Sequence, residues 1–219
     1  DKTYELNVAA TSGYFRTRSA PMGDVMSSTP VLIQGKNLGY SVLPSIEGAS
    51  YKAFLAAESV KAKLLAVGAN DGMLHIFNAT TGAEVFGFVP SALIPKLGKL
   101  AKPSYGHEYY VDGGLLHQHA YINGTWRSIL VGSAGAGAKS VFAIDVTNRA
   151  SPQILFELTS DQVADLGFQF SIPRVSRLPN GLWTMVHGNG FESTTGTAKL
   201  MVTTLPAAFT ANPTVQVVN

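Results

Sequence analysis

One pattern constrains the fold of this chain more than any other feature: a pair of apolar runs joined by a glycine-rich link, which occurs three times. The three stretches cover residues 64–90, 128–158 and 183–205. In each, an apolar run rich in β-branched and aromatic residues ends at a glycine, crosses a glycine-rich link and continues as a second apolar run. Short apolar runs separated by turn residues are typical of antiparallel strands joined as hairpins. The sequence therefore predicts an all-β fold.

The repeat has a near-regular period. Gly68, Gly132 and Gly188 end equivalent runs and are separated by 64 and 56 residues. Residues 70–72 are expected to form a two-residue hairpin turn. A further plausible strand precedes each stretch, at residues 27–34, 109–122 and 168–178, so each unit has four strands. Such units at a steady period predict a β-propeller, whose blades usually take ~40 to ~50 residues. The expected blades are approximately residues 27–90, 108–159 and 168–219, as parts of one propeller domain covering residues 1–219.

The units are longer than a minimal blade, so insertions are expected. Residues 50–63, 90–104 and 160–167 read as short helices or ordered loops. Three blades are too few for a ring that normally needs at least four. We therefore expect the chain to be part of a longer protein, with the tail after Pro206 starting a further strand.

One glycine-rich link resembles a phosphate-binding loop. Gly132 and Gly137 have the required spacing, but Ala138 separates the second glycine from Lys139, so the register is off by one. A phosphate loop must also lead into a helix, whereas residues 141–146 are an apolar run of β-formers. The segment is predicted to be a hairpin connection without a nucleotide.

Composition excludes several classes of protein. With 46% apolar residues the chain can bury a core, and only 14% of its residues are charged. The net charge is +2 and the sequence has no runs of basic residues, so its charge pattern does not indicate nucleic-acid binding. No run approaches the ~20 apolar residues of a membrane span. Because the chain has no cysteine, it offers neither disulfides nor thiolate metal sites.

His117 and His119 are the candidate metal ligands, and they are weak ones. Both lie on a predicted strand, and a spacing of two places their side chains on one face. Two imidazoles could begin a zinc or copper site, but a polar strand face or a hydrogen-bonded pair is the favoured interpretation. His107 and His187 could complete a set, although nothing in the sequence brings them together.

No residue is assigned a catalytic role, and the chain is expected not to be an enzyme. The acidic residues near glycines or strand ends fit side-chain hydrogen bonds to backbone turns. They are Asp71, Asp112, Asp145 and Asp165.

Aromatic residues suggest packing more than ligand stacking. Trp126 and Trp183 occupy similar places in successive units, which favours contact between blades. Tyr109 and Tyr110 could stack on sugars if exposed, but strand alternation predicts that about half of such aromatics are core.

Several segments together resemble the PilC/PilY family of proteins associated with type IV pilus tips. The most distinctive is VGANDGMLHIFNATTGAEVFGFVPSALI at residues 67–94, and the same order continues through YYVDGG, WRSILVGSAGAGAKSVFAIDVTN, DLGFQFSIPRV and GLWTMVHGNGF. Upstream, FRTRSAPMGDVMSSTPVLI is similar to the lead-in of that family. Its matching landmarks are Phe15, Arg16, Arg18, Gly23, Asp24, Ser28 and Pro30.

The resemblance implies a modified β-propeller in the C-terminal part of a large exported protein on the bacterial surface or pilus tip. It implies support of pilus biogenesis, control of retraction and adhesion. The implied partners are minor pilins, other pilus-tip proteins, and host or abiotic surfaces. Some members carry an Asp-rich calcium loop, but no such run occurs here, so calcium is assigned to no residue and no cofactor is detectable. The alternatives are a quinoprotein-like propeller enzyme and a glycan-binding lectin. Residues 91–105 are the expected partner-contact loop, replaceable without loss of the fold.

Overall fold

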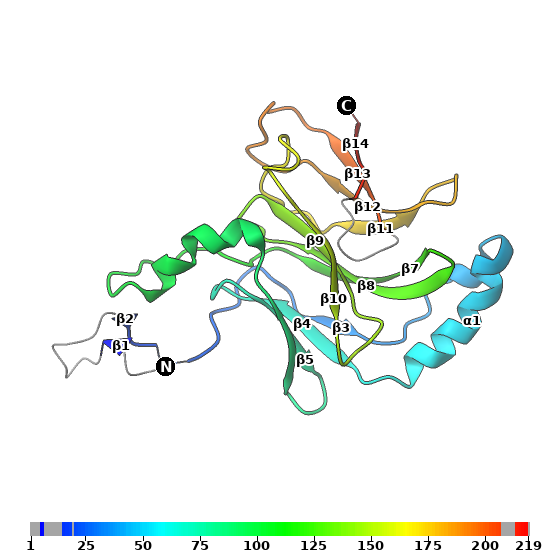
Figure 1. The fold of residues 1–219 in the computed structure, drawn as a ribbon, viewed down its shortest axis with the longest axis horizontal. Helices are drawn as coiled ribbons and strands as arrows, with labels where there is room; N and C mark the ends of the chain where they lie inside the picture. The colour runs from blue at the N-terminus through cyan, green and yellow to red at the C-terminus, as the bar shows by residue number, and fades with distance from the viewer. Residues whose placement is uncertain (1–4, 7–14, 19, 207–212, 219) are drawn as a thin grey trace.

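Three four-stranded antiparallel sheets form the body of the protein (Figure 1). They are seen in a computed structural model that describes residues 5–6, 15–18, 20–206 and 213–218. Within each sheet the strands follow chain order, so each is a simple meander.

The strands of the three sheets have short, regular bounds. The first sheet contains β3 (Val31–Ile33), β4 (Leu64–Gly68), β5 (Leu74–Asn78) and β6 (Glu84–Phe88). The second contains β7 (Leu115–Ile122), β8 (Thr125–Ser133), β9 (Ser140–Asp145) and β10 (Gln153–Thr159). The third contains β11 (Arg174–Arg177), β12 (Trp183–Gly188), β13 (Leu200–Thr204) and β14 (Val215–Val218).

The second sheet is the middle layer, and strand β9 shows why its sequence is apolar throughout. Val141 and Ala143 belong to the core shared with the third sheet, whereas Phe142 and Ile144 belong to the core shared with the first. Successive side chains on a strand point to opposite faces. A strand buried on both faces therefore needs apolar residues at every position instead of an alternating pattern.

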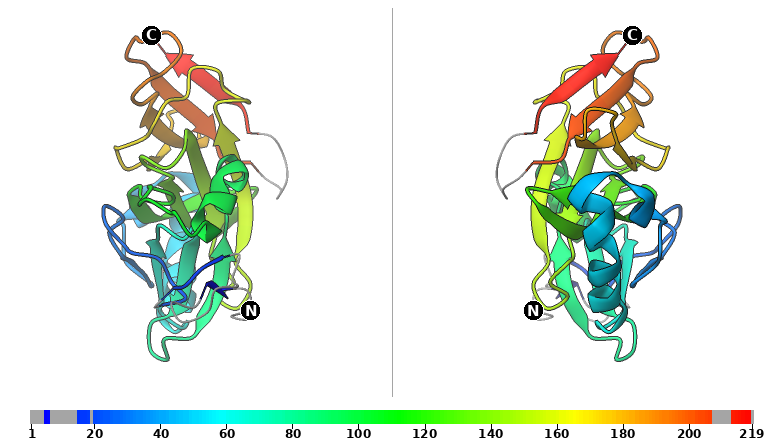
Figure 2. Two further views of the ribbon diagram at one scale, coloured as in Figure 1. Left: turned by 90° about the vertical axis from the view of Figure 1, so that its left-hand side faces the viewer. Right: turned by 90° about the vertical axis from the view of Figure 1, so that its right-hand side faces the viewer.

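The first strands of the three sheets lie together. Strand β7 contacts β3 on one side and β11 on the other, while the later strands of each sheet diverge. The sheets thus radiate from a shared line (Figures 1 and 2). The links at one end of the strands form one face of the array, and those at the other end form the opposite face.

Two helical insertions cover the two faces. Helix α1 (Ser45–Ser59) follows the 3-10 turn η2 (Tyr40–Val42) and joins β3 to β4, and helix η3 (Ser91–Ala101) joins β6 to β7. Figure 2 shows α1 and η3 on opposite sides of the sheets. We call these the α1 face and the η3 face. A short parallel pair, β1 (Glu5–Leu6) with β2 (Phe15–Arg16), precedes the sheets.

Helix α1 differs from its predicted range of residues 50–63. It begins five residues earlier, after Pro44, and ends at Ser59. The first turn of the helix was not predicted, because it contains Gly48 and glycine lowers helix propensity. In the structure a Cβ on Gly48 would lie 2.1 Å from the carbonyl oxygen of Leu43, so only glycine allows this close approach. The predicted insertion at residues 90–104 contains η3.

Of two further predicted elements, one agrees with the structure and one was wrong. Residues 160–167, expected as a short helix or an ordered loop, form successive turns. The strand expected over residues 109–122 begins only at Leu115, because the preceding backbone bonds to neighbouring links: Val111 N donates to Ala69 O at 3.3 Å, and Asp112 N to Ala134 O at 3.2 Å.

The link between β4 and β5 also differs from the two-residue turn expected at residues 70–72. It runs from residue 69 to residue 73, with Ala69 N donating to Met73 O at 2.9 Å. Only Gly72 in this link has a positive φ, of 98°. The longer link places Asp71 on the η3 face, beside the candidate site.

Candidate binding cleft on the η3 face

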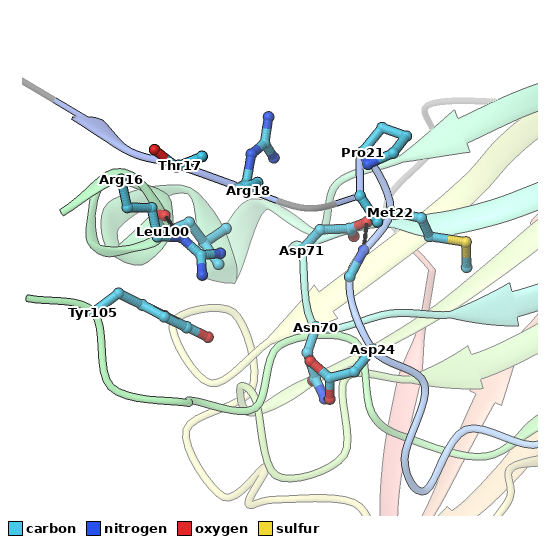
Figure 3. Close-up of a pocket in the computed structure, with 12 residues that line it drawn as sticks. Arg16, Thr17, Arg18, Pro21, Met22, Asp24, Asn70, Asp71, Leu100 and Tyr105 are labelled. Atoms are coloured by element: carbon cyan, nitrogen blue, oxygen red, sulfur yellow. Dashed lines mark hydrogen bonds between the residues drawn. The ribbon is translucent and has the colours of Figure 1, made fainter. Parts of the chain in front are cut away.

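A polar cleft of about 220 Å³ lies where residues 16–18 and 20–24 cross the η3 face (Figure 3). We call residues 15–18 and 20–24 the lead-in segment; Ser19 lies outside the described residues. The other walls are Asn70 and Asp71 of the β4–β5 link, Leu100 of η3, and Tyr105. Segments up to about ninety residues apart in sequence therefore build one site.

Arg16 forms the cationic wall of the cleft. Its Nε donates to the carbonyl oxygen of Leu100 at 2.5 Å, and its guanidinium carbon lies 4.1 Å from the centre of the Tyr105 ring. Stacking on an aromatic face stabilises a guanidinium while leaving its terminal N–H groups available. Arg18 lines the same cleft and is exposed.

Asp71 anchors the lead-in segment to the first sheet. Its carboxylate accepts hydrogen bonds from Gly23 N at 2.7 Å, Met73 N at 3.1 Å and His75 Nε2 at 3.1 Å. Burial alone would raise the pKa of Asp71, but the hydrogen bonds from His75 and Gly23 outweigh it and lower the pKa. Asp71 is therefore an ionised acceptor at neutral pH.

His75 lies between two carboxylates. Its Nε2 faces Asp71, and its Nδ1 is 2.6 Å from Oε1 of Glu84 on β6. The hydrogen bond to Asp71 raises the pKa of His75; burial opposes this, and the hydrogen bond to Glu84 adds to the rise. The imidazolium form thus joins β5, β6 and the β4–β5 link.

Asp24 closes the other end of the cleft. Its Oδ2 accepts from Asn70 Nδ2 at 2.8 Å and from His107 Nε2 at 2.9 Å. Burial would raise the pKa of Asp24, but the hydrogen bonds from Asn70 and His107 lower it overall. Asn70 also accepts from Tyr110 N at 2.9 Å. The cleft is thus fixed to the segment leading into the second sheet.

The chain after the cleft is fixed in the same way. Ser27 N donates to Asp112 Oδ1 at 2.8 Å, and Gly68 N donates to Ser28 Oγ at 2.9 Å. The walls are therefore held by backbone hydrogen bonds before any ligand arrives. The sequence did not predict this site, because Arg16, Arg18 and Asp24 stood out only as landmarks of the family resemblance and Tyr105 only as the last residue of the expected loop at residues 91–105.

The structure brings His117 and His119 together on β7, with ring centres 5.3 Å apart. His117 Nε2 lies 2.6 Å from Ser128 Oγ, and His119 Nδ1 lies 3.0 Å from the Tyr51 hydroxyl. Burial lowers the pKa of His117 to about 3 and that of His119 to about 4. Both rings are therefore neutral.

No third metal ligand joins this pair among the described residues, where no group of three His, Asp or Glu side chains could hold a metal ion. His107 Nε2 instead pairs with Asp24, and His187 Nδ1 lies 2.7 Å from Gly188 O. A metal at His117 and His119 stays a prediction.

The four acidic residues near turns do accept hydrogen bonds from backbone amides, often from amides of another segment of the chain. Asp145 accepts from Thr147 N at 2.8 Å within its own turn. Asp71 accepts from Gly23 N in the lead-in segment, and Asp112 accepts from Ser27 N. Asp165 accepts from Thr195 N at 2.9 Å, thirty residues away.

Of the tyrosine pair, Tyr110 is fully buried and Tyr109 is 40% exposed, but both precede strand β7, so strand alternation does not explain the difference. Lys139 belongs to the glycine-rich link that resembles a phosphate-binding loop. Its side chain donates to Glu192 O at 2.6 Å. Its link joins β8 to β9, so the predicted hairpin is confirmed.

Radiating four-stranded meanders define a module of the β-propeller class. A family model described as the PilY1 beta-propeller domain matches residues 22–208. A solved structure, the Pseudomonas aeruginosa PilY1 C-terminal domain, superimposes with a TM-score of 0.67 and 36% identity. The match covers 84% of this chain and 36% of that one.

Curated relatives agree with the fold. A type IV pilus biogenesis factor PilY1 homolog from Xylella fastidiosa is 42% identical over 200 residues, covering 87% of this chain and 14% of its own length. PilY1 from Pseudomonas aeruginosa strain PAO1 is 42% identical over 195 residues, covering 87% and 17%. The chain therefore belongs to the PilY1 β-propeller family, and it spans under a fifth of the length of these relatives. The predicted all-β propeller fold and the family resemblance are confirmed.

Proposed function

We propose that this chain is a non-enzymatic display module of a larger type IV pilus biogenesis factor. The whole protein would support pilus assembly, control retraction and contribute to adhesion. The observation that carries this proposal is the rigid scaffold: three sheets share two continuous cores and present separate insertions on two opposite faces. Such a scaffold favours display of loops over chemistry.

The proposed setting is the cell surface or pilus tip, reached by export. There the module would contact minor pilins or other tip proteins on one side and host or abiotic surfaces on the other. Within the described residues, no helix combines the length and apolar character needed to cross a membrane.

Helix η3 is the proposed partner-contact element, but only its outer side can serve. Leu93 is fully buried, and Leu97 and Leu100 pack against the core shared by the first and second sheets. Replacing residues 91–105 by a flexible link would therefore open that core, contrary to the expectation from sequence. Ile94 is 59% exposed and Lys102 is also exposed, so these side chains can be changed without loss of the fold.

The test uses Ile94→Ser with Lys102→Ser in the full-length protein. Val60→Ser is the matched control, because Val60 is 85% exposed on the α1 face. We expect normal secretion of both variants, with reduced surface piliation, twitching or attachment only for the η3 variant. Unchanged piliation, motility and attachment would argue against η3 as the contact element. Loss in both variants would point to a general folding defect.

A further inference from the structure

The cleft in Figure 3 contains cationic hydrogen-bond donors and an anionic acceptor that are not fully used within the protein. Arg16 uses Nε for Leu100 and leaves its two terminal nitrogens without a partner among the described residues. Arg18 has no hydrogen bond within the described part of the chain. Across the cleft, the Asp24 carboxylate accepts from Asn70, from His107 and from its own backbone amide, and a carboxylate with about four acceptor positions keeps room for one more donor.

These groups select a ligand by charge. The terminal N–H groups of Arg16 match a planar carboxylate, which guanidinium binds through paired N–H donors, whereas Figure 3 shows the Arg18 guanidinium pointing away from that of Arg16. The ionised Asp24 and Asp71 on the opposite wall disfavour a group with two negative charges, such as a phosphate. They favour hydroxyl groups, which donate hydrogen bonds to carboxylates.

The size of the cleft limits the ligand further. Its volume of about 220 Å³ lies below the roughly 300–1,000 Å³ of pockets for drug-sized ligands. It holds one ring and no extended peptide. Most of its lining side chains are polar, so an apolar side chain would find few partners.

We propose that this cleft binds a single sugar residue that carries one carboxylate, of the hexuronic or sialic acid type. The carboxylate lies against the terminal nitrogens of Arg16, and ring hydroxyls donate to Asp24. The inference gives a ligand class to the attachment part of the proposed function and rests on that function only for its biological setting.

The test is calorimetric titration of the purified protein with glucuronate, galacturonate and N-acetylneuraminate, each against a neutral methyl glycoside. We expect at least one acidic sugar to bind about tenfold more tightly than its neutral counterpart. Arg16→Gln and Asp24→Asn should each weaken binding by about fivefold or more. Lys102→Gln is the matched control, since Lys102 is an exposed cation outside the cleft, and it should bind normally.

Three results would overturn the assignment: no binding at millimolar sugar, equal binding of acidic and neutral sugars, or full binding by both cleft variants. Competition by a glutamate-rich peptide as strong as by the sugar would also overturn it in favour of an acidic peptide. Thermal unfolding of both variants separates lost binding from misfolding, because Arg16→Gln also removes the contacts with Leu100 and Tyr105. Sugar binding is measured without pili, so its failure is distinct from failure of the pilus role.

Discussion

Trp126 and Trp183 meet edge to face across the junction of the second and third sheets, with ring centres 5.4 Å apart. Each is only 3% exposed. Tyr40, from the insertion before α1, stacks on Trp126 with ring centres also 5.4 Å apart and contacts Trp183 edge-on. The predicted packing role of the two tryptophans is therefore confirmed, and the insertion seals the junction between the sheets.

Truncation of either tryptophan should loosen this junction. Trp126→Ala and Trp183→Ala are each expected to lower the free energy of unfolding by about 3–5 kcal/mol, as for large aromatic side chains removed from a core. Because the rings touch, the double variant should lose less than the sum of the two single losses. Urea unfolding of the four proteins measures this coupling. Strict additivity would show that the rings stabilise the two sheets independently.

A buried ion pair ties α1 to the link between β9 and β10. Glu58 Oε2 lies 2.5 Å from Nη2 of Arg149, and both side chains are at most 7% exposed. Glu58→Gln would leave the Arg149 charge buried without its partner, so we expect a loss of about 3–5 kcal/mol in the free energy of unfolding. Glu108→Gln, which breaks an exposed pair with Lys99, is the control. Equal small effects in denaturant unfolding would contradict this role.

The strands of the fold were readable from sequence because glycine links and apolar runs act locally. The apolar run at residues 141–146 predicted β9, and its burial on both faces explains why it does not alternate. The start of helix α1 was misplaced because Gly48 lowers the local helix propensity, whereas the close approach of its backbone to Leu43 O, which requires a glycine there, is seen only in the structure.

The cleft was beyond sequence reasoning for a similar reason. Arg16 meets Tyr105 and Leu100 across more than eighty residues, and no spacing rule relates them. Asp71 was predicted to serve its own turn. It does so through Met73 N, but the contacts with Gly23 and His75 that make it part of a site depend on the path of the lead-in segment.

The buried histidines predict loss of stability in acid. His117 and His119 have pKa values of about 3 and about 4 in the folded protein, against about 6.5 in an unfolded chain. Between about pH 6.5 and about pH 4 the unfolded state binds more protons than the folded state. The free energy of unfolding should therefore fall by about 1.4 kcal/mol for each histidine with every unit by which the pH is lowered. Burial also lowers the pKa of His187, which adds in the same direction.

Urea unfolding across this pH range checks that prediction. His119→Gln keeps a side-chain amide able to hydrogen-bond the Tyr51 hydroxyl but removes one titrating group. Its unfolding free energy should therefore depend on pH less steeply than that of the parent. An unchanged slope would mean that His119 titrates normally in the folded protein.

His75 predicts the opposite behaviour above neutral pH. The charged groups facing it are Asp71 from the β4–β5 link and Glu84 from β6, and both raise its pKa above the ordinary 6.5. A raised folded pKa gives stability that is complete below about pH 6.5 and is lost as pH rises through the folded value. NMR titration of the imidazole should give a midpoint above 6.5, and Asp71→Asn should lower it. Glu108→Gln, on an exposed pair, should leave it unchanged. A His75 midpoint at or below 6.5 in the parent protein would show that burial outweighs the two carboxylates.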